Sequence, residues 1–197
     1  MRTKLWMAVA LSASLTACMT PPTAYVTHQF QTIRPDQIAA AQQPLRLQVV
    51  TRRFRGDKLY DDVSPWVYSG AVQALDSSRV IQPSPQGEDG KILVVVKELD
   101  ATAGDTASGV GKGILMGLTL GAIGSTATGE FDISLEITTN GKTIAHAPVR
   151  VDVSIRMGSA SVPPGLQTYR DANDALKQAL SDAILWAIWD MQQKGVL

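Results

Sequence analysis

The pattern of apolar and polar positions predicts two strands in the first half of the chain. Leu45, Leu47 and Val49 alternate with polar residues, which is typical of a strand with one buried face. The run 92–96 is apolar at every position. A strand that is apolar on both faces belongs in the middle of a sheet or beneath a covering layer, so we expect 92–96 to be central.

Two segments show helical spacing instead. Ser64-Pro65 is typical of an N-cap followed by proline at the first helical position, and apolar residues then recur at helical spacing as far as Ser77. A second helix is predicted near the carboxyl end, with Thr168 or Asp171 as its N-cap. Its apolar stripe consists of Ala172, Ala175, Leu176, Ala179, Leu180, Ala183, Ile184, Ala187 and Ile188.

Two alternating segments around Asn140-Gly141 predict a β-hairpin with a type I′ turn. A two-residue turn pairs Ile137 with Ile144, but the same register places Val149 on the polar face of the sheet. A slip of one residue moves every side chain to the other face. We therefore predict a β-bulge between about residues 145 and 148, where Pro148 is tolerated.

The order of these elements predicts an α+β fold. We expect an antiparallel sheet of about four strands, two helices on one face, and a Gly-rich hydrophobic insertion at about residues 104–129, within a single domain over residues 45–197. Residues 18–44 contain several prolines and no sustained periodicity. We expect them to form a tether that reaches about 80 Å when extended. Four apolar residues could still dock part of it onto the domain: Tyr25, Val26, Phe30 and Ile33.

The insertion contains four glycines spaced four residues apart: Gly109, Gly113, Gly117 and Gly121. On a helix they line one face with bare backbone, which resembles the small-xxx-small spacing of membrane helices. As a helix, the uncharged stretch 113–129 is about 25 Å long, which is marginal for crossing a membrane. The segment either inserts partly into lipid or packs closely on a protein, or it is a mobile loop that folds back on the domain.

Two further groups of side chains are candidate contact sites. Trp186 and Trp189 lie off the apolar stripe of the last helix, so they either pack beneath the tether or the sheet edge, or contact a partner. A basic cluster near the first strand is either a solvated edge that discourages strand pairing or a patch for lipid phosphates or an acidic partner. Its members are Arg46, Arg52, Arg53, Arg55 and Lys58.

Composition narrows the possible chemistry. The 197 residues include 18 Lys plus Arg and 18 Asp plus Glu, a balance that argues against nucleic-acid binding. One cysteine and two histidines exclude an internal disulfide and a zinc cluster of several Cys and His ligands. The sequence places no nucleophile beside His28 or His146. We therefore expect no catalytic site, metal or cofactor, and expect each histidine to be exposed or a simple hydrogen-bond partner.

The first residues predict a secretory signal peptide. Arg2 and Lys4 precede a mostly apolar stretch at 5–15, which spans about 16 Å as a helix, half of a hydrocarbon core. The run Leu15-Thr16-Ala17-Cys18 resembles the lipobox of bacterial lipoproteins. An ordinary secreted protein with a chance cysteine is the alternative.

The lipobox resemblance implies a processed and acylated amino terminus. In that family the signal peptide at residues 1–17 is cleaved between Ala17 and Cys18, and Cys18 carries fatty acyl chains such as palmitate, which anchor it stably. Met19 stands where inner-membrane retention requires Asp, so the resemblance implies the outer membrane. Cleavage leaves 16 basic and 18 acidic residues, a net charge of −2.

In layout, the whole chain resembles small envelope lipoproteins of the YajG and transport-auxiliary kind. That resemblance implies a non-enzymatic accessory or binding component in cell-envelope assembly or transport, with its domain in the periplasm and an envelope protein as possible partner. The alternative is a glycine-zipper-driven oligomeric membrane component of the surface-exclusion or secretion type. A monomer in detergent that co-purifies with another envelope protein would favour the first, and a homogeneous ring or bundle the second.

Overall fold

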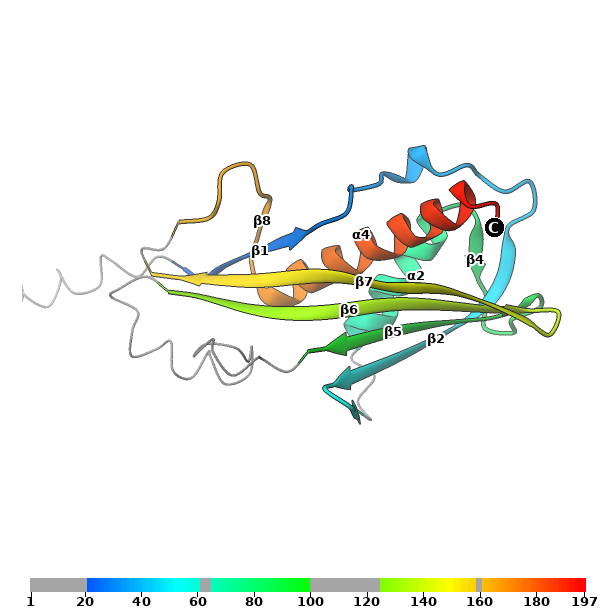
Figure 1. Ribbon diagram of the computed structural model, residues 1–197, viewed down its shortest axis with the longest axis horizontal. Helices are drawn as coiled ribbons and strands as arrows, with labels where there is room; N and C mark the ends of the chain where they lie inside the picture. The colour runs from blue at the N-terminus through cyan, green and yellow to red at the C-terminus, as the bar shows by residue number, and fades with distance from the viewer. Residues whose placement is uncertain (1–20, 61–64, 100–124, 159–160) are drawn as a thin grey trace, which may run out of the picture.

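A computed structural model of the chain describes residues 21–60, 65–99, 125–158 and 161–197. These residues form a mixed eight-stranded sheet, shown in Figure 1. Its strands are β1 (Thr23–His28), β2 (Leu45–Arg55), β3 (Lys58–Tyr60), β4 (Ile81–Pro83), β5 (Gly90–Glu98), β6 (Ser125–Thr139), β7 (Lys142–Met157) and β8 (Thr168–Tyr169). The spatial order is β3-β2-β5-β6-β7-β1-β8, and β4 pairs with β2.

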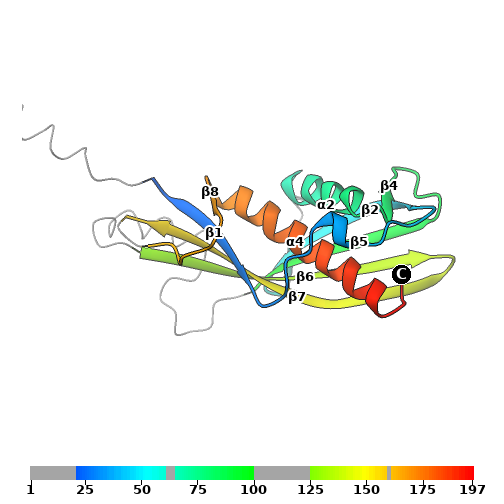
Figure 2. The ribbon, with the colours of Figure 1, turned by 90° about the horizontal axis from the view of Figure 1, so that it is seen from above.

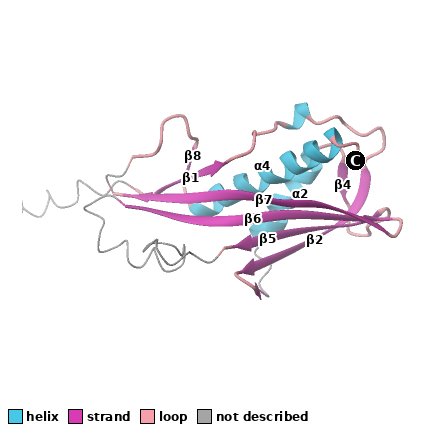
Figure 3. Cartoon of the chain, in the orientation of Figure 1, coloured by secondary structure: helices cyan, strands magenta, loops and turns pink. Residues whose placement is uncertain are grey.

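Two α-helices in the described residues lie side by side on one face of this sheet (Figures 2 and 3). They are α2 (Pro65–Ser77) and α4 (Ala172–Gln193), and a short 3-10 helix, η1 (Pro35–Gln37), follows β1. The carboxylate of Asp171 caps α4 by accepting hydrogen bonds from the backbone N–H groups of Asn173 and Asp174. Asp171 is thus the cap, and Thr168, the other candidate, lies in β8.

The expected antiparallel sheet of about four strands is wrong, because the sheet has eight strands and is mixed. β2 pairs in parallel with β5 and with β4. The physical reason is the order of elements: α2 follows β2 and returns the chain across one face, so the next strands run in the same direction as β2. The short strands β3 and β8 pair with the ends of longer ones over two or three residues.

The β6–β7 hairpin has the predicted turn and the predicted bulge. Asn140 and Gly141 both have positive φ, and Ile137 pairs with Ile144. Farther along, Leu135 pairs with His146 whereas Ile133 pairs with Val149, so two residues of β7 face one residue of β6. The extra residue at 147–148 restores Val149 to the buried face of the sheet, where it is 5% exposed.

The segment that we expected to be a tether contributes a strand to the sheet. β1 pairs antiparallel with β7 from Thr23 to His28. Beyond β1, Ile33 and Ile38 are buried in the core. The sequence left open whether apolar residues dock part of this segment onto the domain. In the structure, the segment packs against the domain over most of its length.

The core fills the space between the sheet and the two helices. The predicted central strand β5 lies between β2 and β6, and alternate residues such as Ile92 and Val94 are fully buried. The other largest fully buried side chains are Phe131, Ile33, Leu47, Leu75, Ile81, Leu135, Ile137, Leu180, Ile184, Ile188 and Val67.

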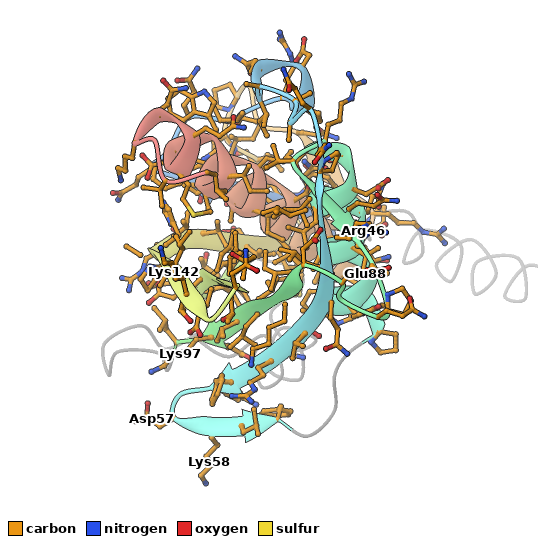
Figure 4. All side chains as sticks on the ribbon, turned by 90° about the vertical axis from the view of Figure 1, so that its right-hand side faces the viewer. Arg46, Asp57, Lys58, Glu88, Lys97 and Lys142 are labelled. Carbon is orange, nitrogen blue, oxygen red and sulfur yellow. The ribbon has the colours of Figure 1, made fainter. Side chains whose placement is uncertain are left out.

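The long β6–β7 hairpin runs along the longest axis of the molecule and defines its two ends (Figure 1). Thr23 and Thr126 both pair with Arg156, on opposite sides of β7, so they lie at one end. The hairpin turn and the carboxyl terminus lie at the other end (Figure 1). Figure 4 views that second end, with Lys142 beside the turn.

Candidate functional site

Most of the residues predicted to form a site lie outside the described part of the chain. These are Ala17, Cys18, Gly109, Gly113, Gly117 and Gly121. Trp186 and Trp189 lie on α4, and both are half-buried against the core. A role for these two residues in contacting a partner stays a prediction.

A row of polar and aromatic residues follows α4 at intervals of four. Its members are Gln178, Asp182, Trp186, Asp190 and Lys194. Residues four apart on a helix are neighbours on its surface. Segments from β1 and β7 cover this row, and they carry the two histidines of the chain.

His146 of β7 is held at the carboxyl-terminal half of the row. Its Nε2 lies 2.9 Å from Asp190 Oδ2 and its Nδ1 lies 2.7 Å from the carbonyl oxygen of Ala147. Both partners are acceptors when Asp190 is ionised, so the imidazole satisfies both only with a proton on each ring nitrogen. The ring also packs edge-on against Trp186, with centroids 5.2 Å apart.

The charge of Asp190 is stabilised by its neighbours. A hydrogen bond from Lys194 is the main cause that lowers the pKa of the Asp190 carboxyl, and the hydrogen bond from His146 contributes in the same direction. Asp190 therefore links the bulged part of β7 to the last turn of α4.

His28, the last residue of β1, lies at the other half of the row. Its Nδ1 donates to the carbonyl oxygen of Phe30 at 2.8 Å, and its ring stacks on Phe30 with centroids 4.0 Å apart. Phe30 in turn packs against Trp186 at 5.4 Å. Packing beneath this segment was one of the two interpretations of the tryptophan pair, and it is the arrangement observed for Trp186.

Asp182 is the most buried charged group of the row, with 7% of its surface exposed. Its Oδ1 accepts a hydrogen bond of 2.8 Å from the amide of Gln178, and its Oδ2 lies 3.9 Å from His28 Nε2. Burial raises the pKa of the Asp182 carboxyl, because the charged form loses water and these two neighbours compensate only in part.

A cavity of about 390 Å³ opens beside Asp182, between α2, α4 and the segment Thr32–Pro35. Gly70 of α2 lies at its inner wall, where a Cβ atom would be only 3.3 Å from Leu180. Polar side chains from both helices line the cavity, and they include Gln73, Lys177 and Asp182.

Members of the basic cluster predicted near β2 contact acidic and aromatic side chains of the fold. Arg53 donates to Glu98 at 3.2 Å, and Arg55 lies 3.8 Å from the same carboxylate. The Arg53 guanidinium also lies 5.5 Å from the ring centroid of Tyr60 and 5.7 Å from that of Trp66. These contacts support a structural role for Arg53 at the β2 edge.

Reasoning from sequence missed the two aspartates and the cavity. Both histidines were expected to be exposed or simple hydrogen-bond partners, and His146 is of the second kind: it is buried and hydrogen-bonded to Asp190. The four-residue spacing of Asp182, Trp186 and Asp190 was the only available signal. Within the described ranges, no three side chains of His, Cys, Asp or Glu are grouped so that they could hold a metal ion.

Comparisons with known proteins give only distant likeness. No family model matches the chain, and no curated protein matches it. A variant PelC dodecamer from Paraburkholderia phytofirmans has 13% identity and a TM-score of 0.34, covering 87% of this chain and 97% of that one. A second PelC dodecamer structure from the same organism has 9% identity and a TM-score of 0.32, covering 85% and 95%. An uncharacterized protein has 11% identity and a TM-score of 0.31, covering 80% and 96%.

Proposed function

We propose that this protein is a lipid-anchored outer-membrane lipoprotein whose periplasmic domain acts as a non-enzymatic binding component in envelope assembly or transport. The run Leu15-Thr16-Ala17-Cys18, preceded by a charged and an apolar segment, supports the anchor. The four residues 19–22 separate Cys18 from the start of β1. At about 3.3 Å per residue they keep the folded domain within roughly 20 Å of the lipid.

One observation carries the proposal: the segment that follows Cys18 and the Gly-rich segment 100–124 join the sheet at neighbouring positions. Thr23 and Thr126 pair with the same residue of β7, Arg156, so they are about 10 Å apart across two strand spacings. The chain enters β1 from Cys18 and enters β6 from the Gly-rich segment 100–124. The lipid anchor and the carboxyl end of the apolar insertion therefore adjoin the same end of the molecule.

The contacts of the two histidines are structural. His146 attaches β7 to α4 through Asp190, and His28 places the segment after β1 over α4. Both side chains hold elements of the fold together. Among the helices that the structure describes, none combines the length and apolar character needed to cross a membrane.

Metabolic labelling tests the anchor. The full-length protein is expressed in a Gram-negative host with an alkyne fatty acid, and the label is detected after purification. We expect label on the wild type and on Met19→Ala, and none on Cys18→Ala, because Cys18 is the only thiol in the chain. Label that persists in Cys18→Ala, or an unlabelled wild type recovered in the soluble periplasmic fraction, would contradict the proposal.

A further inference from the structure

The cavity between α2 and α4 presents a buried carboxylate whose charge is incompletely balanced by the protein. The side chain of Asp182 is 9% exposed, and its Oδ2 lies 3.9 Å from His28 Nε2. That distance is too long for a hydrogen bond. A buried carboxylate normally receives several donors or a close cation, because an unbalanced charge in a protein interior is costly.

Asp190 provides an internal comparison on the same helix. It receives hydrogen bonds from both Lys194 and His146, and its pKa is lowered. Asp182 receives one hydrogen bond, from the neutral amide of Gln178, and its pKa is raised by burial. Of these two aspartates, the one that lines the cavity is thus the one that lacks a close cationic partner.

The cavity lining contains two cations and, besides Asp182, the exposed carboxylate of Asp174. The cations are Lys177 and Arg34, and both are exposed. The Arg34 guanidinium is paired with Asp36 at 3.1 Å, whereas Lys177 has no ion-pair partner within 4.0 Å among the described residues. A simple cation entering the cavity would be repelled by Lys177, and a simple anion would be repelled by Asp182.

We propose that this cavity binds a small zwitterionic ligand, with a primary ammonium group at Asp182 and a phosphate or carboxylate group at Lys177. The ammonium donates to the Asp182 carboxylate, whose Oδ2 accepts no hydrogen bond from the described residues, and the anionic group meets Lys177, the one cation among the described lining residues that lies outside the Arg34–Asp36 pair. A volume of about 390 Å³ accommodates a molecule of this size. The chemistry is that of an aminoalkyl phosphate, either free in solution or as a lipid headgroup. The inference does not depend on the lipid anchor.

Calorimetric titration of the full-length mature protein in detergent tests the site, with O-phosphoethanolamine as the probe. Ethanolamine and ethyl phosphate each carry only one of the two charges. We expect the zwitterion to bind at least about tenfold more tightly than either single-charge compound, because each of those compounds lacks one of the two hydrogen bonds to a charged side chain. Equal affinity for phosphoethanolamine and ethyl phosphate, or no binding by any probe, would overturn the proposal.

Matched variants locate the ligand. Asp182→Asn keeps the shape and the Gln178 contact, and we expect it to weaken phosphoethanolamine at least about tenfold. Lys177→Gln should weaken phosphoethanolamine but leave ethanolamine unchanged. Asp190→Asn, the same substitution two turns along α4 and outside the cavity lining, should leave binding unchanged. Binding that survives Asp182→Asn at wild-type strength would contradict the site.

A third comparison separates the two sources of ligand. Micelles containing lysophosphatidylethanolamine are titrated against micelles containing lysophosphatidylcholine, whose quaternary ammonium cannot donate a hydrogen bond. Binding of both free phosphoethanolamine and the ethanolamine lipid supports a headgroup site. Binding of the free compound alone supports a soluble zwitterion, and binding of both lipids equally would contradict recognition by Asp182.

Discussion

Asp182 and Asp190 are the same residue type on the same helix, yet their surroundings shift the carboxyl pKa in opposite directions. Burial dominates at Asp182 and raises its pKa. The Lys194 hydrogen bond dominates at Asp190 and lowers its pKa. A raised carboxyl pKa means that the ionised group opposes folding at neutral pH, whereas a lowered pKa means that ionisation favours folding.

Thermal unfolding of the two asparagine variants should therefore differ in sign. At pH 7 we expect Asp190→Asn to lower the Tm, because the folded state loses a favourable charge. This deficit should shrink as the pH falls below the ordinary value of 3.8 and through the folded pKa, where wild-type Asp190 is itself protonated.

Asp182→Asn should raise the Tm at pH 7, because a neutral amide avoids the cost of a buried charge and keeps the Gln178 hydrogen bond. This gain should disappear as the pH falls through the raised pKa toward 3.8. Each variant serves as the control for the other, since the chemical change is identical. A shift of the same sign in both would show that the local charges do not determine the effect.

The contacts between these side chains could not be predicted from the sequence. His28 and Asp182 meet only because β1 pairs with β7 and places the following segment over α4. No local pattern near either residue signals that contact. The spacing of Asp182, Trp186 and Asp190 predicts a shared side of the helix, but it does not show which segment covers that side.

At the scale of the elements, strong periodicity predicted most of the long strands and helices correctly. β2, β5, the β6–β7 hairpin, α2 and α4 all occur where apolar residues alternate or recur at helical spacing. β1 escaped prediction because Thr23–His28 is short and follows two prolines, so its pairing with β7 determines its conformation. The parallel pairing of β2 and β5 was missed because residue patterns predict strands without their direction.

The bulge at Ala147–Pro148 is a feature that sequence alone determined, and it allows a direct test. Deleting Ala147 removes the extra residue of the bulge. The residues of β7 on one side of the deletion, either 142–146 or 149–157, must then turn their apolar side chains to the exposed face of the sheet. Val149, Val151 and Val153 are each at most 5% exposed. We expect a loss of more than about 3 kcal/mol in the free energy of unfolding, or failure to fold.

Denaturant unfolding followed by tryptophan fluorescence measures this loss. Pro148→Ala is the matched control, because it changes an exposed bulge residue without altering the residue count. We expect that control to change stability by less than about 1 kcal/mol. A deletion variant as stable as the control would mean that the bulge does not determine the register.

For the whole molecule, the proposed lipid anchor at Cys18 predicts that the two ends of the sheet lie at different distances from the membrane. Thr126 and Lys142 are both exposed and lie at opposite ends of the β6–β7 hairpin. A fluorophore is attached to a cysteine introduced at one or the other position, where it is the only free thiol once Cys18 is acylated. In vesicles with quencher-bearing lipids, we expect strong quenching at Thr126→Cys and weak quenching at Lys142→Cys. Equal quenching would contradict the proposed orientation.

If the protein is exported as proposed, the position of β1 also affects the time course of its folding. β1 pairs only with β7 and β8 among the described strands, and these lie near the opposite end of the sequence. For a chain that is translocated from its amino terminus, β1 must wait without a partner until residues 151–169 have crossed the inner membrane. Pairing between such distant segments is intrinsically slow. In the proposed lipoprotein, acylation at Cys18 can therefore be completed before the sheet forms next to it.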